Sequence, residues 1–383
     1  MLAPIGVYGI ADQIKNPPPL LQAILDNRID DAARLLEQGA SATARYHKIV
    51  PYFVAAASLR PCDPRMLDLL IAHGANVNGV WITLPGRHGD SPFDAYISPL
   101  AAAASAGSDA CVATLIRHGA DPNIVSLEGV TPLGAAAGSM YCKPEMVDFL
   151  LKHGADPNLT PSLDDLPPKV VGHIMSGLGN LPGPRKRALA AKFRPTLKVP
   201  ALDLAVAYAR PACARALIMS GANVEAQGME GTLLTDAVSI GRSPAITRML
   251  LLAGADVHAR NEQGETPLFM GAADFGSPDS PKIFSQYCVE CASMLINAGA
   301  EVDAVDKTGN TPLVYAADGE DALPLVRLLV DAGADVNYRN PKTGMTPLRS
   351  AQSAHNAAVV SFLISRGATA SSGGTEGKPA GTP

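Results

Sequence analysis

The 383-residue chain is poor in aromatic residues, in charge and in long apolar runs. Aromatic residues make up 5% of it, with one tryptophan, and charged residues make up 17%. Because 47% of the residues are hydrophobic, the chain does not have the composition of a disordered protein. No apolar run approaches the roughly 18–20 residues of a membrane-spanning helix. The net charge of −5 argues against general nucleic-acid binding across the whole surface.

Cysteine is sparse for this length. Six cysteines in 383 residues are too few for a small secreted domain held together by disulfides. We therefore expect reduced thiols and a cytoplasmic location. The N-terminal stretch MLAPIGVYGIADQ has no basic residue ahead of its apolar part, so we expect no signal peptide. The cysteines are Cys62, Cys111, Cys142, Cys213, Cys288 and Cys291.

What the chain does have is an internal repeat. The dipeptide Gly-Ala with a leucine four residues before its glycine recurs nine times. The pattern predicts a helix whose C-terminal cap is a glycine in the left-handed conformation. Thr-Pro-Leu begins four of the units and predicts an N-cap followed by a first helical turn. The nine glycines are Gly39, Gly74, Gly119, Gly154, Gly221, Gly254, Gly299, Gly333 and Gly367; the threonines are Thr131, Thr266, Thr311 and Thr346.

These residues resemble the ankyrin repeat, with Gly-x-Thr-Pro-Leu, an alanine-rich first helix, a second helix ending Leu-Leu-x-x-Gly-Ala, and Asp-Val-Asn. The resemblance covers about residues 18–370. It implies an all-α solenoid of helix–turn–helix pairs with projecting β-hairpin loops. Residues 1–17 form an N-terminal segment in this interpretation, and residues 371–383 form a disordered tail. The histidine usual after Thr-Pro-Leu is replaced by Gly134, Phe269, Val314 and Arg349.

The first break in the period is a long finger at residues 79–97. The interval from Gly74 to Ser98 is 24 residues, whereas the interval from Gly119 to Thr131 is 12. Aromatic and apolar residues on a projecting loop indicate an anchor for a partner. The alternative is that the finger packs on its own repeats. Its candidate contact residues are Trp81, Arg87, His88 and Tyr96.

A second break lies at residues 159–199, which are either an insertion or a degenerate tenth repeat. The segment contains a basic run without an acid, which could attract an anionic membrane, nucleic acid or an acidic protein face. The alternative is a solvated helix face. A third break, residues 274–287 in the seventh repeat, is interpreted as a surface loop. The basic run comprises Arg185, Lys186, Arg187, Lys192, Arg194 and Lys198.

The remaining chemical patterns favour structural roles. Cys288 and Cys291 form a lone CxxC, but Cys291 stands eight residues before its repeat glycine, as Cys111 and Cys213 do. We interpret all three as small buried residues rather than metal or redox sites. Histidines precede three successive repeat glycines, at His73, His118 and His153, where a histidine favours the helix dipole. No catalytic motif is present, so we expect neither an enzyme nor a cofactor or metal.

The resemblance implies a non-enzymatic scaffold that binds a partner protein on the concave surface of hairpins and first helices. Such a protein acts by tethering or occlusion, and we expect a monomer when it is free. Proteins similar to it include bacterial effectors, toxin-neutralising partners and signalling adaptors, so the resemblance does not identify the partner. The alternative is an adaptor that docks on anionic membrane or nucleic acid through residues 185–198. The later hairpins supply the candidates Arg260, Asn261, Tyr338 and Arg339.

Overall fold

The computed structural model describes residues 16–46, 50–79, 81–82, 96–125, 130–159, 200–229, 231–272, 283–319 and 322–369. At residues 50, 81–82, 96–97 and 283–288 it describes the backbone alone. The chain divides into an N-terminal unit, residues 1–255, and a C-terminal unit, residues 256–383.

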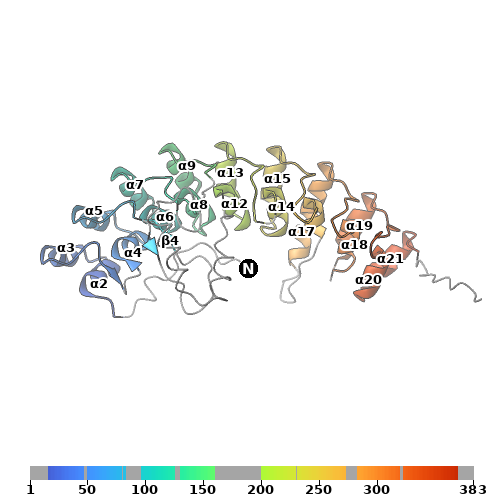
Figure 1. Cartoon of the computed structure of the whole chain (residues 1–383), viewed down its shortest axis with the longest axis horizontal. Coiled ribbons are helices and arrows are strands. Elements are labelled where there is room, and N and C mark those ends of the chain that lie inside the picture. Colours follow the sequence, from blue (N-terminus) through green and yellow to red (C-terminus); the bar gives the residue numbers. More distant parts are fainter. Residues whose placement is uncertain are drawn as a thin grey trace, which may run out of the picture. The chain divides into compact units, whose positions relative to one another are not determined.

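The described part of the N-terminal unit contains six helix pairs, one for each of the first six repeats. They are α2 (Pro19–Leu25) with α3 (Ile29–Glu37), α4 (Tyr52–Ser58) with α5 (Pro64–Ala72), α6 (Pro99–Ser105) with α7 (Asp109–Arg117), α8 (Pro132–Gly138) with α9 (Pro144–Lys152), α12 (Ala201–Ala207) with α13 (Pro211–Met219), and α14 (Leu233–Ser239) with α15 (Pro244–Leu252). Successive first helices contact one another, as α4, α6, α8, α12 and α14 do, and Figure 1 shows the second helices in a parallel row above them.

The described part of the C-terminal unit contains three further pairs, for repeats seven to nine. They are α16 (Pro267–Ala272) with α17 (Ile283–Asn297), α18 (Pro312–Ala316) with α19 (Leu323–Asp331), and α20 (Pro347–Ser353) with α21 (Ala357–Ser365). Helix α18 contacts both α16 and α20, while α19 contacts α17 and α21. Each unit is therefore a two-layer stack of helix pairs, as the repeat pattern predicts.

The signals at the helix ends are largely confirmed. All nine repeat glycines have positive φ, from +83° at Gly119 to +98° at Gly333. Thr131 and Thr346 cap α8 and α20 by accepting hydrogen bonds from backbone amides. Thr311 does not cap α18, and its buried hydroxyl oxygen has no hydrogen-bond partner among the described residues. The triplet therefore marks the start of the helix in each case, but a capping hydrogen bond does not always follow.

An asparagine ladder ties repeats two to five to one another. The side-chain amide of Asn78 donates to the carbonyl of Gly119 over 2.9 Å, and that of Asn123 donates to Gly154 over 2.8 Å. Asn158 makes the same bond to Gly221 over 3.0 Å, across the segment that follows residue 159. Helix α8 also contacts α12 directly. The repeats on either side of residues 160–199 therefore pack on each other.

The histidines before the repeat glycines have the structural role that the sequence predicts. The Nδ1 atom of His73 donates to the Leu69 carbonyl over 2.9 Å, and that of His153 donates to the Phe149 carbonyl over 2.8 Å. The Nε2 atom of His118 lies 2.7 Å from an Asp68 carboxylate oxygen of the preceding repeat.

Short antiparallel strands form the bases of two hairpins. Strand β1 (Arg45–Tyr46) pairs with β2 (Val50–Pro51), and β3 (Trp81–Ile82) pairs with β4 (Tyr96–Ile97). The second of these hairpins is the base of the finger.

The cysteines correct the expectation of reduced thiols. Cys62 is joined to Cys111 and Cys142 to Cys213, with Cα–Cα distances of 6.3 and 6.4 Å. A count of cysteines misses this because stacking brings together residues that lie 49 and 71 positions apart in the chain. Cys111, Cys213 and Cys291 are fully buried, as their place in the repeat predicts. The expected cytoplasmic location loses the support that it had from reduced thiols.

None of the described helices is both long enough and apolar enough to cross a membrane.

Candidate partner-binding surface

The first helices of the N-terminal unit offer almost no surface to a partner. Every residue of α6, α8 and α12 is buried. Alanine dominates α6 and the middle of α8, which lets neighbouring helices approach closely. The resemblance implies that first helices form part of the concave binding surface. At these three repeats, however, the first helix exposes no residue that a partner could contact. In the C-terminal unit, by contrast, Arg349 of α20 is exposed.

The hairpin loops of the C-terminal unit share one design. In each loop a side-chain oxygen accepts a hydrogen bond from the backbone amide two residues later, which is an Asx turn. The same residue's backbone amide closes the loop by donating to a carbonyl four or five residues on. These turns begin at Asn261, Asp306 and Asn340.

The three loops are hydrogen-bonded to one another. The Lys307 amide donates to the Gln263 carbonyl over 2.9 Å and links the first two loops. The Asn340 side-chain amide donates to the Thr308 carbonyl over 3.2 Å and to the Asn310 side chain over 2.6 Å. Asn340 is 1% exposed, so these bonds are shielded from water. We call residues 260–265, 305–310 and 338–345 the hairpin row.

Of the four partner-binding candidates on the later hairpins, two link neighbouring loops of this row and a third closes its own loop. The Arg260 guanidinium donates to the Gly264 carbonyl over 2.9 Å and to the Val305 carbonyl over 2.8 Å. The Asn261 side chain closes its own turn. The Tyr338 hydroxyl donates to the Gly309 carbonyl over 2.7 Å. Residue type at a loop tip suggested contact with a partner, but it gave no sign of these bonds to neighbouring loops.

Arg339, the fourth, is exposed at the last hairpin. A Cβ atom placed on Gly344 would lie 3.5 Å from one Arg339 nitrogen and 3.9 Å from an Arg349 nitrogen. The Arg349 guanidinium also donates to the Gly344 carbonyl over 3.3 Å. Among the described residues no carboxylate forms an ion pair with either arginine. In the sequence, Arg349 stands out only because it replaces the histidine usual after Thr-Pro-Leu, and this replacement was the available signal that it could bind a partner.

Most of the other candidates lie outside the described residues. The backbones of Trp81 and Tyr96 are placed, with Trp81 opposite Ile97 and Ile82 opposite Tyr96, but their side chains are not described. The other candidates of the finger and of the basic run lie entirely outside the described residues and remain predictions. They are Arg87, His88, Arg185, Lys186, Arg187, Lys192 and Arg194.

A pair of buried carboxyl groups was not predicted from the sequence. Asp203 of α12 and Asp236 of α14 are 1% and 0% exposed and hydrogen-bond each other. Asp236 also accepts a hydrogen bond from the Met229 amide, whereas Asp203 Oδ1 has no hydrogen-bond partner among the described residues. Burial, and then the neighbouring Asp236, raise the pKa of Asp203 to about 9. The pair therefore holds a proton at neutral pH, in a place that no substrate can reach.

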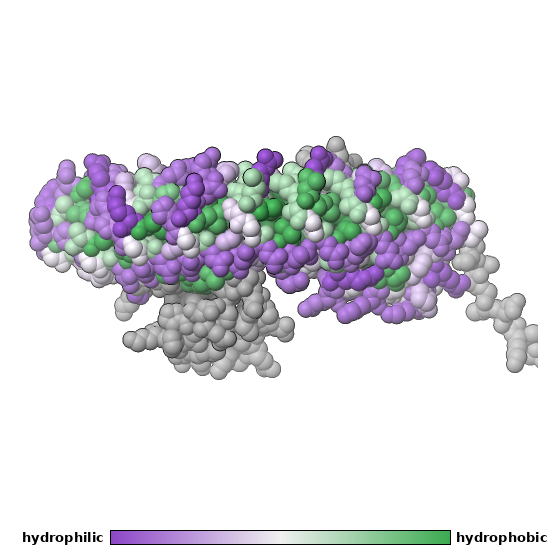
Figure 2. All heavy atoms as spheres, turned by 90° about the horizontal axis from the view of Figure 1, so that it is seen from above, coloured by the Kyte–Doolittle hydropathy of each residue, from purple (hydrophilic) through white to green (hydrophobic). Residues whose placement is uncertain are grey.

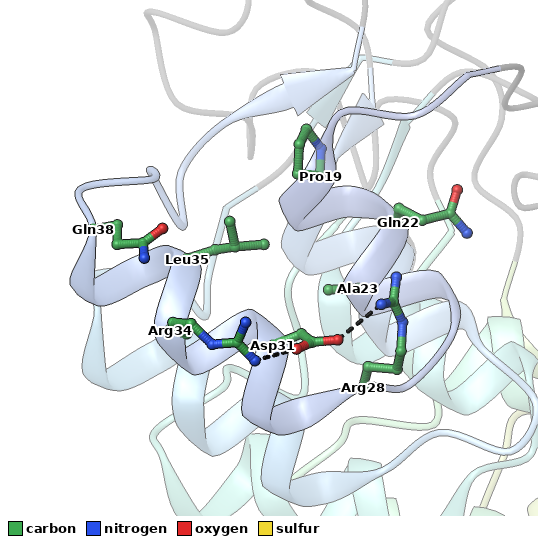
Figure 3. A pocket seen from close by; sticks show the side chains of 8 residues that line it. All are labelled: Pro19, Gln22, Ala23, Arg28, Asp31, Arg34, Leu35 and Gln38. Carbon is green, nitrogen blue, oxygen red and sulfur yellow. Dashed lines mark hydrogen bonds and ion pairs between the residues drawn. The ribbon is translucent and has the colours of Figure 1, made fainter.

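A small cavity of about 310 Å³ lies beside the first helix pair. Figure 3 shows Asp31 between Arg28 and Arg34, and it is ion-paired to both. Asp26 also pairs with Arg28 over 3.2 Å, so two carboxylates balance the two guanidinium groups beside this open cavity. Among the residues that the structure covers, no group of three or more His, Cys, Asp or Glu side chains could hold a metal ion.

The outer helices carry few large exposed apolar side chains. Met219 of α13 is 81% exposed and Leu252 of α15 is 82% exposed, each two residues before its repeat glycine. In Figure 2 small hydrophobic patches alternate with hydrophilic ones along the visible face. Scattered apolar residues of this kind are normal on protein surfaces and do not mark a site.

Comparison with known families decides the class. The family described as ankyrin repeats (3 copies) matches residues 53–161 and 283–372, just over half of the chain. The chain belongs to the ankyrin-repeat family. Ankyrin repeats are generally protein–protein interaction modules and are typically not enzymes. No curated protein matches the sequence.

Proposed function

We propose that this ankyrin-repeat protein is a non-enzymatic scaffold that binds a partner protein along its hairpin edge. The hairpin row carries the proposal, because its three loops are bonded to one another before any partner arrives. A surface that is already rigid loses little conformational entropy on binding. The protein acts by tethering or covering its partner, without turnover, and it is a monomer when free.

The chemistry of the edge favours an acidic partner segment. Arg339 and Arg349 flank Gly344 at the last hairpin, and no described carboxylate neutralises them. Arginine forms bidentate hydrogen bonds with carboxylates and is among the residues most often found at the energetic centre of interfaces. In the same proposal the finger, with Trp81, Arg87, His88 and Tyr96, is a second contact. A bacterial effector and a toxin-neutralising protein both act by holding or covering a partner, and this edge suits either role.

The test is affinity capture with the full chain, followed by a measured Kd for the purified partner. The double variant Arg339→Ala with Arg349→Ala removes the two charges at the hairpin edge. We expect it to bind at least about tenfold more weakly, which corresponds to about 1.4 kcal/mol.

The matched control is Lys152→Ala with Arg215→Ala, which removes two exposed charges from second helices. This control should bind like the native chain. Equal weakening in both variants would show that net charge, and not the hairpin edge, governs binding. Native affinity in both would remove Arg339 and Arg349 from the interface.

A further inference from the structure

The two disulfides occupy the same place in two different pairs of repeats. Cys62 and Cys142 each stand 12 residues before the glycine that ends their repeat, while Cys111 and Cys213 stand eight residues before theirs. Each disulfide therefore joins the turn between the two helices of one repeat to the second helix of the next. Four cysteines at two register positions form one type of link, made twice.

The backbone around the two turns is also alike. The C-cap residue after α4 is Leu59, with φ −65° and ψ 153°, and the C-cap residue after α8 is Ser139, with φ −62° and ψ 145°. Both are extended C-caps, and in both repeats a proline begins the second helix two residues after the cysteine. Helix α14 has no cysteine after it, and its C-cap at Ile240 is helical instead, with φ −89° and ψ −59°. The turn is shaped in the same way wherever it carries a half-cystine in these repeats.

Each disulfide spans a repeat interface that a long insertion interrupts. Cys62–Cys111 joins repeats two and three, and the finger at residues 79–97 lies between them in the chain. Cys142–Cys213 joins repeats four and five, which residues 160–199 separate. A longer connection makes it entropically harder to bring two neighbours together, and a cross-link offsets that loss. The insertion at residues 274–287 lies within a repeat, so it separates no such pair.

The surroundings of the disulfides are those of structural cross-links. Cys111 and Cys213 are fully buried and Cys62 and Cys142 are half-buried, whereas labile or regulatory disulfides are typically exposed. The turn edge around them is closed by contacts between repeats. The Arg60 guanidinium carbon lies 3.1 Å from the centroid of the Tyr141 ring, and Lys143 pairs with Asp109 over 2.7 Å.

We propose that this protein folds and acts in an oxidising compartment, where Cys62–Cys111 and Cys142–Cys213 are permanent links across its two interrupted repeat interfaces. Structural disulfides persist in such compartments and are kept reduced in the cytosol. The partner bound at the hairpin edge then belongs to the same compartment. This inference does not depend on the hairpin edge being the binding site.

The links form by thiol–disulfide exchange with a disulfide-donating thiol oxidase. One cysteine thiolate of the chain attacks the donor's disulfide and forms a mixed disulfide with it. The second thiolate then attacks the chain's sulfur in that mixed disulfide and expels the donor. The chain loses two protons and two electrons for each link, and the donor leaves as a dithiol.

The direct test reads the thiols in living cells that produce the protein. Cells are quenched in acid, free thiols are blocked with N-ethylmaleimide, and the remaining cysteines are reduced and labelled with iodoacetamide. We expect the second label on Cys62, Cys111, Cys142 and Cys213, and cross-linked 62–111 and 142–213 peptides in an unreduced digest. An isotopically labelled, reduced copy of the full chain, added at the quench, reports oxidation during handling. N-ethylmaleimide on all four cysteines of the cellular protein would overturn the proposal.

A second measurement separates permanent links from incidental ones. A reductant should lower the melting temperature of the native chain by at least about 5 °C. A chain with all four linking cysteines replaced by alanine should not respond to the reductant, whereas the control Cys291→Ala should respond like the native chain. If the fourfold variant fails to fold, the native chain and the control still decide the question. A native melting temperature that the reductant leaves unchanged would show that the links are not structural.

Discussion

The N-terminal and C-terminal units build the same helix pairs but reinforce them at opposite edges. In the N-terminal unit, two disulfides each join a turn to the second helix of the next repeat, and Arg60 stacks on Tyr141 between the turns of repeats two and four. In the described part of the C-terminal unit, the hairpin row supplies the reinforcement through hydrogen bonds. In a repeat protein each interface contributes its own share of stability, so each can be reinforced separately. The disulfides lie where long insertions interrupt the stack, so they stabilise the repeat interfaces that the insertions weaken.

Removing one disulfide should have the largest effect on the stability of the N-terminal unit. Cys142→Ala with Cys213→Ala should lower the free energy of unfolding of the N-terminal unit by about 4 kcal/mol, because the 71-residue separation is no longer closed in the unfolded chain. Urea unfolding followed by circular dichroism measures the loss. Cys291→Ala, which removes a buried cysteine from the other unit, should cost far less. An equal loss in both variants would contradict a special role for the link.

A pH titration sharpens the comparison, because the buried carboxyl pair lies in the N-terminal unit. Burial raises the pKa of Asp203 to about 9 from an ordinary value of 3.8, so the folded chain holds more protons between these two values. The stability that protonated Asp203 contributes to the folded chain is therefore complete below about pH 4 and is lost as the pH rises toward 9. We expect the free energy of unfolding to fall by on the order of 1 kcal/mol per pH unit between pH 5 and 8.

The matched variant for this titration is Asp203→Asn, which keeps the shape of the side chain and cannot ionise. Its stability should depend less on pH than that of the native chain over the same range. Parallel curves for the two proteins would show that Asp203 does not hold the proton.

The hairpin row can be broken at Asn340. Asn340→Ala removes a fully buried side chain that donates hydrogen bonds to Thr308 and Asn310, so the C-terminal unit should lose about 2 kcal/mol. Hydrogen exchange read by mass spectrometry should show faster exchange in residues 305–345 and no change in the N-terminal unit. The control Thr343→Ala changes an exposed residue of the same loop and should have a much smaller effect. Native exchange in Asn340→Ala would mean that the row does not hold the loops.

The smallest effect is expected for a surface ion pair. Arg366 and Asp331 lie 2.8 Å apart between neighbouring second helices of the C-terminal unit, with side chains 42% and 59% exposed. Because water and salt screen such a pair, Asp331→Ala should change the stability by less than about 0.5 kcal/mol. Thermal unfolding at low and at high salt checks this, and a loss as large as that of Asn340→Ala would contradict it.

The repeat framework was predictable because its signals are local. Glycine at a helix end and threonine before proline act within one turn of helix, so the chain alone marks all nine helix pairs. The disulfides were not predicted, since pairing depends on which residues meet after stacking, although the shared register of Cys62 and Cys142 was visible. The roles of Arg260 and Tyr338 depend on carbonyl groups of neighbouring loops, which side-chain type does not reveal. Asp203 and Asp236 are each the sole charged residue of a short helix, and that was the signal available in the sequence.

Reduction of the disulfides should loosen the N-terminal unit and leave the C-terminal unit intact. Hydrogen exchange of the full chain, with and without a reductant, tests it most directly, because exchange reports each helix separately. We predict faster exchange on reduction in α4 to α7 and in α8 to α13, with unchanged exchange in α18 to α21. Unchanged exchange throughout, or an equal increase in both units, would contradict the account.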